Sequence, residues 1–396
     1  MTVPFQVLLG DLRTGKIITQ VPATVGTWQV VSTGAGLINA TVNVAAQSTT
    51  NQDIFHATAP AKAFLAIQYG NTILAAGPIW TRHYTRSAGT LELGAAGLWS
   101  LFDHRLVMPV LAQPVAVGAA QAAVTTYPTS SNMSYADIAA ALITQAMAHV
   151  GGTLPLVLPT AQGFTPGRTH TYDGYDLPVL GSMLTNLTQT INGPEIQFAP
   201  RYQADGTSIE WVMRAGTPTS PTLTQGGDDW YFDASVPQTM VADIDYDDDA
   251  TTMGTRAWTV GAGSKAGIVL SEADSTTLTA AGYPLLEVVD RNHTSDATQA
   301  DLDAYAAQLL TQSSRPSSVW KITVRNDGAP ANNTPITGTG GPRLDEYTAG
   351  DYCQVIVGAD PFLAPGPRRA RILQIDGDIN PGIQSTITLA TMTAEV

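Results

Sequence analysis

The sequence has few cysteines, few lysines and no long apolar run. Cys353 is its single cysteine, which excludes an internal disulfide framework and any zinc site built from several cysteines. It lies in an apparent strand, LDEYTAGDYCQVIVG, where we expect it to be a small buried hydrophobe. No stretch reaches the roughly 18 consecutive apolar residues that cross a bilayer. The N-terminal MTVPFQVLLGDLRTGK lacks a basic region before its apolar run, so we expect neither a signal peptide nor a membrane anchor. With a single cysteine, we also expect the chain to fold in a reducing cytoplasm.

Charge is scarce and unevenly distributed among residue types. The chain has 26 aspartates and 7 glutamates against 15 arginines and 4 lysines, for a formal net charge of −14. Nucleic-acid binding needs a basic face, so this balance argues against it and leaves protein, ion and sugar partners open. Aspartate collects at turns and caps, whereas glutamate favours helices. With 36 glycines and 25 prolines, the composition indicates many strands joined by many turns.

Strand-like runs dominate both ends of the chain. At 396 residues we expect two to four packed units of about 100–150 residues each. The spacing of short strands in residues 1–120 indicates a small barrel or sandwich, closed by a short helix in GLWSLFDHRLV. The layout of residues 63–95 recurs in residues 351–391, and whether these are two related barrels or a chance likeness stays open at this point. The N-terminal runs are PFQVLLG, KIITQV, TWQVVST, AFLAIQYG, NTILAAGPIW and GTLELGA.

Three helices are predicted between these ends. Ser134 and Asp137 have the spacing of a capping box, which predicts a helix over 134–150. An apolar stripe at spacings of 3 and 4 predicts a second helix over 177–191, capped by Asp176, and a third runs over 298–311. The runs PEIQFAPRY and SIEWVMRAG after the second helix predict a hairpin. The stripe consists of Leu177, Leu180, Leu184, Leu187 and Ile191.

Two glycine-containing segments resemble phosphate-binding loops only in part. Gly10 to Lys16 matches G-x4-G-K, but Ile17 stands where a magnesium-binding Ser or Thr belongs, and the segment lies between two strands. We therefore expect a hairpin turn there. Gly261, Gly263 and Gly267 miss the dinucleotide-binding spacing by one residue, so we expect a bend after a strand.

No catalytic constellation is evident from the residue types and spacings. The six histidines are scattered, and the most site-like is His170, in RTHTYDGYD beside Asp173 and Asp176. We expect it to be an ordinary loop histidine. The chain also lacks the G-x-S-x-G and H-E-x-x-H signatures of hydrolases.

One acidic segment is the only candidate metal feature. No Lys or Arg occurs between Arg214 and Arg256, and DIDYDDDA lies inside that interval. Alternating carboxylates can supply several calcium ligands, so Asp243, Asp245 and Asp247 are candidate calcium residues, with Asp248 and Asp249 beside them. The alternative interpretation is a solvated acidic loop, because the glycine and terminal glutamate of an EF-hand are absent.

Several stretches together resemble the hub proteins of long-tailed bacteriophages. ILAAGPIWTRHYTRSAGTLELGAAGLWSLFDHRLV (residues 73–107) is similar to the first barrel of siphophage minor tail proteins, particularly those of actinobacterial phages. YPLLEVVDRNHTSDATQADLDAYAAQLL (283–310), followed by YTAGDYCQVIV (347–357) and RRARILQI (368–375), has the strand, helix and barrel order of the same family. With YDLPVLGSMLTNLTQTINGPEIQF (175–198) between them, the likeness spans nearly the whole chain.

The resemblance implies a mainly β fold of two small β-barrels with an inserted α/β domain. The expected organisation is 1–120 as the first barrel, 121–210 and 250–319 as two parts of the α/β domain, 211–249 as an acidic β segment, and 320–396 as the second barrel. The resemblance brings no catalytic residues and no cofactor. Because the last predicted strand ends the chain, we expect any lytic activity to belong to another protein.

The function implied by the resemblance is that of a structural tail-tip or baseplate hub. Such a hub is a homotrimer that closes the tail tube, adapts its sixfold symmetry to a threefold tip, and forms the channel for DNA and the tape-measure protein. Its expected partners are the distal tail protein, the tape-measure protein and downstream tail-tip or fibre proteins, with assembly in the host cytoplasm and a place at the virion tail tip.

Two rival interpretations involve carbohydrate. A capsule or cell-wall hydrolase would need two carboxylates about 5–10 Å apart in a cleft, and no such pair can be chosen from the sequence. A carbohydrate-binding tail protein would use exposed aromatic side chains, although most tryptophans lie on apolar strands and are expected in the core. The candidates are Trp80, Trp99, Trp211, Trp230, Trp258 and Trp320.

Overall fold

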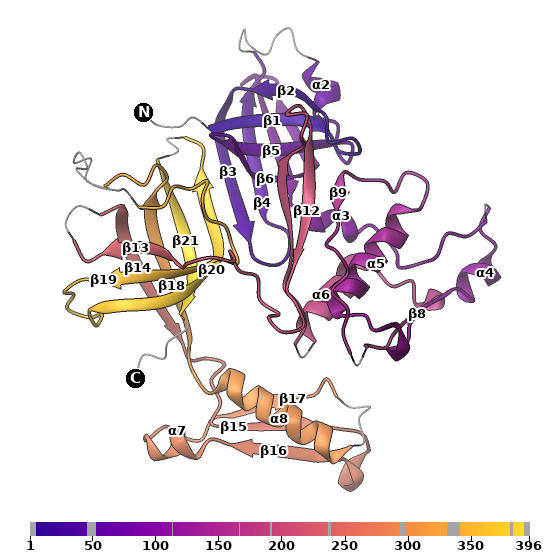
Figure 1. The fold of residues 1–396 in the computed structure, drawn as a ribbon, viewed down its shortest axis with the longest axis vertical. Helices are drawn as coiled ribbons and strands as arrows, with labels where there is room; N and C mark the ends of the chain where they lie inside the picture. The colour runs from indigo at the N-terminus through magenta and orange to yellow at the C-terminus, as the bar shows by residue number, and fades with distance from the viewer. Residues whose placement is uncertain are drawn as a thin grey trace. The chain divides into compact units, whose positions relative to one another are not determined.

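The chain folds into two compact units, one formed by residues 1–244 and 322–396 and the other by residues 245–321. A computed structural model gives this fold, which is drawn in Figure 1. In the described part of the chain, no helix is long and apolar enough to cross a membrane. The structure describes residues 5–45, 53–112, 114–165, 167–190, 192–236, 239–293, 298–330, 341–380 and 383–391.

The N-terminal part of the large unit is an antiparallel sheet with the strand order β3-β4-β7-β6-β5-β1-β2. Each strand predicted in this region is present, and β4 is one that the sequence analysis missed. β5 is buried along its whole length, as its run of Ala, Phe, Leu and Ile requires. The elements are β1 (Phe5–Asp11), β2 (Ile17–Val21), β3 (Ala23–Val31), β4 (Leu37–Asn43), α2 (Ile54–Ala57), β5 (Ala63–Tyr69), β6 (Thr72–Thr85), β7 (Thr90–Ala96) and α3 (Trp99–Phe102).

The C-terminal strands extend the same sheet through one long strand, β20. One edge of β20 pairs with β21, and its other edge pairs first with β19 and then with β3. A bulge between Ile372 and Gln374 in the β20–β21 pairing accompanies this change of neighbour. The elements are β13 (Trp230–Ala234), β14 (Val241–Asp249), β18 (Ser317–Arg325), β19 (Tyr352–Val357), β20 (Gly366–Asp378) and β21 (Gln384–Thr391).

The strand order repeats within the 13-stranded sheet. In chain order β3, β4, β5, β6 and β7 pair as β3-β4-β7-β6-β5, and β14, β18, β19, β20 and β21 pair as β14-β18-β21-β20-β19. The likeness between residues 63–95 and 351–391 is therefore a likeness of strand order as well as of sequence layout.

The prediction of a mainly β fold is confirmed, but that of two closed small barrels is not. Among the described residues the pairing leaves β2 and β14 as the ends of one continuous path, and no closed barrel forms. The physical reason is that β20 hydrogen-bonds to β3, which merges the two expected barrels into one sheet.

Helices and short strands between residues 117 and 215 share a core with the N-terminal sheet. Leu142 of α5 and Leu184 of α6 belong to the same buried cluster as Phe64 of β5 and Trp211 of β12. Residues 121–210 therefore pack with the N-terminal sheet, whereas residues 245–321 form a unit of their own. The elements are α4 (Val117–Gln121), β8 (Val124–Tyr127), η1 (Thr129–Ser131), α5 (Tyr135–Met147), β9 (Leu156–Val157), β10 (His170–Asp173), η2 (Gly174–Asp176), α6 (Leu180–Gln189), β11 (Ile196–Tyr202) and β12 (Ile209–Ala215).

The smaller unit is a three-stranded sheet, in the order β16-β15-β17, packed against α8. Leu302 and Ala306 of α8 are fully buried. The unit is inserted in the chain between β14 and β18, the place that corresponds to the β3–β4 turn of the other repeat. The elements are β15 (Arg256–Val260), η3 (Lys265–Gly267), β16 (Leu270–Asp274), α7 (Thr276–Ala280), β17 (Glu287–Asp290) and α8 (Gln299–Ser313).

The three predicted helices are present as α5, α6 and α8, with one correction. The Ser134–Asp137 capping box at the start of α5 is confirmed. Asp176 does not cap α6, which begins at Leu180 after an N-cap residue, Val179, that has no side-chain hydrogen bond. Leu177 has a left-handed φ of 47° and precedes Pro178, and a residue before proline is disfavoured in a helix.

Gly77 lies where β6 passes close to the end of β7, and we predict that a side chain there is not tolerated. A Cβ atom at residue 77 would lie 1.8 Å from the carbonyl oxygen of Ala96. Gly77→Ala should therefore lower the free energy of unfolding by about 2–3 kcal/mol, measured by urea denaturation. Gly227→Ala is the control, because nothing lies within 4 Å of the added methyl group. Equal midpoints for the two variants would contradict the close approach.

Candidate functional site

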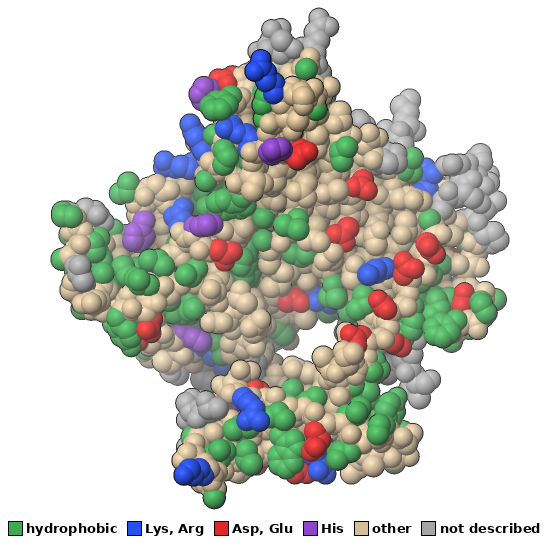
Figure 2. All heavy atoms as spheres, turned by 180° about the vertical axis from the view of Figure 1, so that it is seen from behind, with side chains coloured by type: hydrophobic (Ala, Val, Ile, Leu, Met, Phe, Trp, Pro, Cys, Tyr) green, Lys and Arg blue, Asp and Glu red, His purple; other side chains and the backbone are tan. Residues whose placement is uncertain are grey.

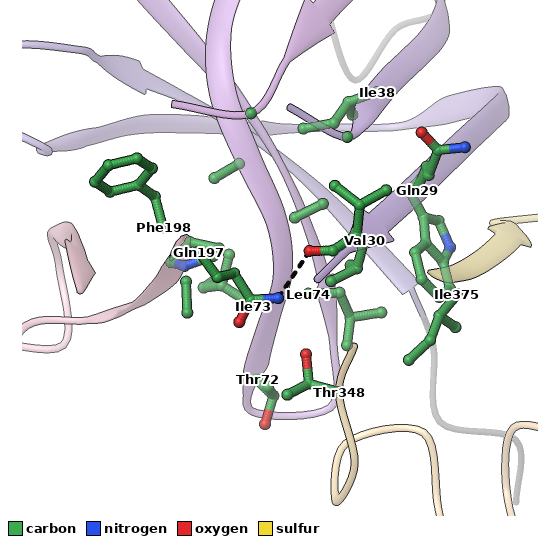
Figure 3. A pocket seen from close by; sticks show the side chains of 18 of the residues that line it. Gln29, Val30, Ile38, Thr72, Ile73, Leu74, Gln197, Phe198, Thr348 and Ile375 are labelled. Carbon is green, nitrogen blue, oxygen red and sulfur yellow. Dashed lines mark hydrogen bonds between the residues drawn. The ribbon is translucent and has the colours of Figure 1, made fainter. Parts of the chain in front are cut away.

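A cavity of about 270 Å³ lies in the large unit, lined by residues from both halves of the sheet. Its walls come from β3, the start of β6, β11, β20 and residues 344–348, and Figure 3 shows Phe198 and Gln197 across from Val30 and Ile38. Two buried donors among its lining residues, Trp28 Nε1 and the Tyr347 hydroxyl, have no hydrogen-bond partner among the described residues. Burial raises the pKa of Tyr347, so its hydroxyl stays protonated and able to donate.

Gln197 connects three segments at the edge of this cavity. Its Nε2 donates to the carbonyl oxygens of Val31, at 2.9 Å, and Ala349, at 3.2 Å. Its Oε1 accepts a hydrogen bond from Arg214 at 2.9 Å. One buried amide group therefore holds β11 against β3 and against the turn before β19. The oxygen of the same amide binds Arg214.

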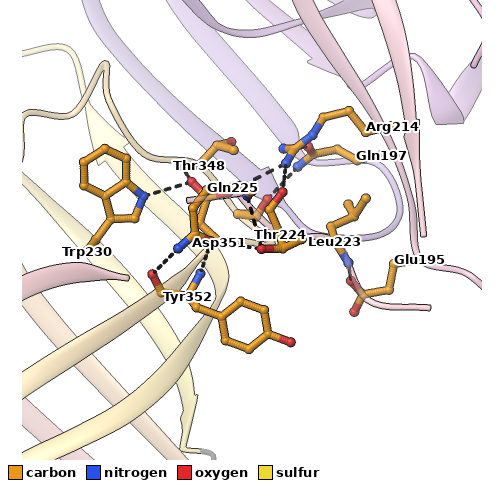
Figure 4. Close-up of polar contacts among 12 residues, drawn as sticks. Glu195, Gln197, Arg214, Leu223, Thr224, Gln225, Trp230, Thr348, Asp351 and Tyr352 are labelled. Atoms are coloured by element: carbon orange, nitrogen blue, oxygen red, sulfur yellow. Dashed lines mark hydrogen bonds and ion pairs between the residues drawn. The ribbon is translucent and has the colours of Figure 1, made fainter. Parts of the chain in front are cut away.

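A network of buried polar groups continues from Gln197 to the C-terminal strands, as Figure 4 shows. Asp351 is its centre: its Oδ2 accepts from Thr348 N at 2.9 Å and from Trp230 Nε1 at 3.2 Å, and its Oδ1 lies 3.7 Å from Arg214. Gln225 lies beside it, with its Oε1 accepting from Tyr352 N at 2.9 Å. We call Glu195, Gln197, Arg214, Gln225, Asp351 and Arg371 the polar junction.

Two arginines of β20 bind carboxylates from earlier parts of the chain. Arg371 is buried and makes a two-point ion pair with Glu195, which also accepts from Leu223 N at 2.9 Å. Arg369, two residues away, is half exposed and binds Asp229 at 2.7 Å, which lowers the pKa of Asp229. These contacts tie β20 to the β11–β12 hairpin and to the start of β13. The carboxylates are thus used to position segments of the chain.

The calcium candidates lie on a strand rather than in a loop. Asp243, Asp245 and Asp247 are exposed, at alternate positions of β14. On an extended strand about 13 Å separates the backbone positions of the first and third aspartates. The oxygen ligands of a calcium ion, in contrast, all lie within about 2.6 Å of the ion. In the described ranges no three His, Cys, Asp or Glu side chains gather as a metal site needs. Calcium binding here stays an untested prediction.

The other residues that the sequence analysis names lie in separate parts of the structure. Gly10 to Lys16 forms the predicted turn between β1 and β2, and Gly263 (φ 118°) forms the predicted bend after β15. His170 lies on β10 rather than in a loop; burial first, and then Arg168, lower its pKa. Asp173 accepts a hydrogen bond from the Tyr175 hydroxyl at 3.2 Å.

The cysteine follows the core expectation, whereas only three of the six candidate tryptophans are buried. Cys353 is buried on β19, and burial raises the pKa of its thiol. The residues of the cavity and of the polar junction are not predicted as a site by the sequence. A sequence carries no local signal for groups that meet from distant parts of the chain. Trp99, Trp211 and Trp320 are buried, while Trp80, Trp230 and Trp258 are partly exposed.

Comparison with solved structures finds the whole fold in phage-type tail proteins. No protein-family model matches the chain, and no curated protein matches it in sequence. A tail protein from Neisseria meningitidis MC58 is similar over 98% of this chain and 96% of its own, with 14% identity and a TM-score of 0.53. The 43 kDa tail protein of prophage MuSo2 from Shewanella oneidensis is similar over 98% of both chains, with 11% identity and a TM-score of 0.56. The likeness is one of fold; the narrower resemblance to actinobacterial siphophage hubs stays a prediction.

Arg371 and Arg369 offer a matched test of the polar junction. Arg371→Met leaves the Glu195 carboxylate largely buried and without its cation, which should cost about 3 kcal/mol of unfolding free energy. Arg369→Met removes a half-exposed pair and should cost less than about 1 kcal/mol. Urea denaturation of both variants measures the difference. The double variant Glu195→Leu/Arg371→Met should be more stable than Arg371→Met alone, and the opposite order would contradict the buried pair.

Gln197 should be more important for stability than an exposed glutamine of the same sheet. Gln197→Leu leaves the carbonyl groups of Val31 and Ala349 and the guanidinium of Arg214 without their partner. The expected loss is about 2–4 kcal/mol of unfolding free energy. Gln20→Leu, on the exposed side of β2, is the control and should change it by less than about 0.5 kcal/mol. A Gln197→Leu protein as stable as the control would show that the amide does not hold the segments together.

Proposed function

We propose that the chain is a structural protein of a phage-type tail and that it acts as the hub at the tail tip. The observation that supports this is the end-to-end likeness of fold: the two tail proteins match over at least 96% of their own length as well as 98% of this chain. A fold alone does not determine a function. Here, however, the likeness covers nearly the whole of both chains, and the hydrogen bonds and ion pairs of the junction join the chain's own segments.

The internal repeat supports the symmetry part of the proposal. Each chain contains the strand order β3-β4-β7-β6-β5 and its counterpart β14-β18-β21-β20-β19. Three copies in a ring would therefore present six similar sheet segments to a sixfold tube while keeping a threefold face for the tip. A homotrimer of this kind is a physically simple adaptor, because both symmetries come from one chain.

The proposed partners follow from that position in the particle. The hub would contact the distal tail protein and the tape-measure protein on the tube side and tip or fibre proteins on the other side. Around a threefold axis the acidic strand β14 would recur three times, and exposed carboxylates there would keep passing DNA from adhering. On the face shown in Figure 2, acidic and basic side chains are interspersed among apolar and uncharged ones. Assembly in the host cytoplasm, a place at the virion tail tip and the absence of enzymatic activity belong to the same proposal.

The assembly is the most direct test of this function. We expect electron cryo-microscopy of purified tails, or of the chain co-expressed with its neighbouring tail proteins, to show three copies at the end of the tube. Each copy should present its two repeats around the axis, so that six equivalent sheet segments meet the last tube ring. Mass photometry of the purified complex should give three times the 41.6 kDa chain mass for this component. A single copy per tail, or a ring of another order, would contradict the hub proposal.

A further inference from the structure

Arg168 is a partly buried arginine that lies against two aromatic rings. Its guanidinium carbon lies 4.4 Å from the ring centre of Phe164 and 4.8 Å from that of Tyr135. Such cation–π contacts use the faces of the guanidinium, whereas its five N–H donors lie in its plane. None of those donors has an acceptor among the residues that the structure describes; only the backbone N–H of Arg168 is engaged, with Met133 O at 3.3 Å.

The other partly buried arginines show how unusual this is. Arg82 and Arg105 donate to backbone carbonyl oxygens. Arg214, Arg256 and Arg343 lie against carboxylates. Arg86, whose side chain likewise has no acceptor among the described residues, is exposed to solvent. A guanidinium that is partly removed from water without an acceptor is energetically costly. The in-plane N–H donors of Arg168 are therefore available to an acceptor from outside the chain.

Arg168 lines a small pocket next to the start of α5. Its lining includes the start of α5, with Ser134, Tyr135 and Ala136, and Asn192 from the turn after α6. The backbone N–H groups of Tyr135 and Ala136 occupy helix positions that have no acceptor within the helix. The pocket volume is about 20 Å³, which is room for one small polar group and not for a whole sugar or side chain.

The nearby titratable groups do not neutralise Arg168. Burial raises the pKa of Asp137, but hydrogen bonds from Gln162, Ser134 and Gly163 outweigh it and lower the pKa overall. Those same N–H groups occupy the Asp137 carboxylate, and no ion pair joins it to Arg168 in the described ranges. The lowered pKa of His170 keeps its ring neutral at pH 7, so it adds no second charge.

We infer that Arg168 and the start of α5 form a binding site for a single oxyanion group, a carboxylate or a phosphate, carried by a ligand that otherwise lies outside the pocket. A guanidinium edge makes two parallel hydrogen bonds to such a group, which lysine cannot reproduce. Phe164 and Tyr135 contact the guanidinium, and Asn192 lines the same pocket as a neutral donor. The inference is independent of the tail-hub function and holds for the isolated chain.

Arginine side-chain NMR of the full chain tests this site directly. The Nε–Hε signal of Arg168 is the one that disappears in Arg168→Lys. Titration with D-glucuronate supplies a carboxylate, inorganic phosphate supplies the other oxyanion, and D-glucose is the neutral probe. We expect the Arg168 signal to shift and saturate with glucuronate, phosphate or both, and not with glucose. Whichever anion binds more tightly identifies the chemistry of the natural ligand.

Three variants decide whether the binding belongs to this site. Isothermal titration should show binding weakened more than about tenfold in Arg168→Gln and substantially in Arg168→Lys, which keeps the charge but not the planar edge. Arg86→Gln removes the same charge from an exposed position and should bind as the wild type does. Circular dichroism checks folding, and Arg168→Lys serves if Arg168→Gln misfolds. An unshifted Arg168 signal, or equal binding by the Arg168 and Arg86 variants, would overturn the inference.

Discussion

Strand β20 makes the hydrogen bonds on which the arrangement of the large unit depends. It is 13 residues long, pairs with β21 on one edge, and divides its other edge between β19 and β3. Two repeats that are similar in strand order therefore become parts of one sheet and do not close separately. Because β3 is at residues 23–31 and β20 at 366–378, this pairing joins strands that are more than 300 residues apart in the sequence.

The polar junction and the cavity are both consequences of that pairing. Where β20 changes its neighbour from β19 to β3, backbone groups and side chains from distant segments are brought together without a regular ladder to satisfy them. Glu195, Gln197 and Asp351 satisfy them instead, through buried hydrogen bonds and ion pairs. Side chains do not fill the remaining space, and Trp28 and Tyr347, which line it, each have a buried donor without a partner among the described residues. Buried polar groups of this kind specify one arrangement of segments.

Local patterns predicted the elements well where one face of an element is clearly apolar. The alternating runs of the N-terminal strands, the capping box at Ser134 and the stripe of α6 all correspond to observed elements. β4 was missed although Ile38, Ala40 and Val42 alternate with polar residues, because asparagines and a small alanine weaken the pattern. The apolar periodicity extends back to Leu177, but Pro178 disfavours a helical Leu177, so α6 begins only at Leu180.

The sequence by itself determined the class of fold, the positions of most strands and helices, and the absence of a local catalytic motif. These depend on residues within a few positions of one another, so short-range patterns are sufficient. Only the tertiary structure decided that the expected barrels share one sheet, that Arg371 and Arg369 have different partners and burial, and that the guanidinium donors of Arg168 have no acceptor among the described residues. Such facts depend on which segments meet in space, in the first two cases across more than a hundred residues. Neither composition nor periodicity contains that information.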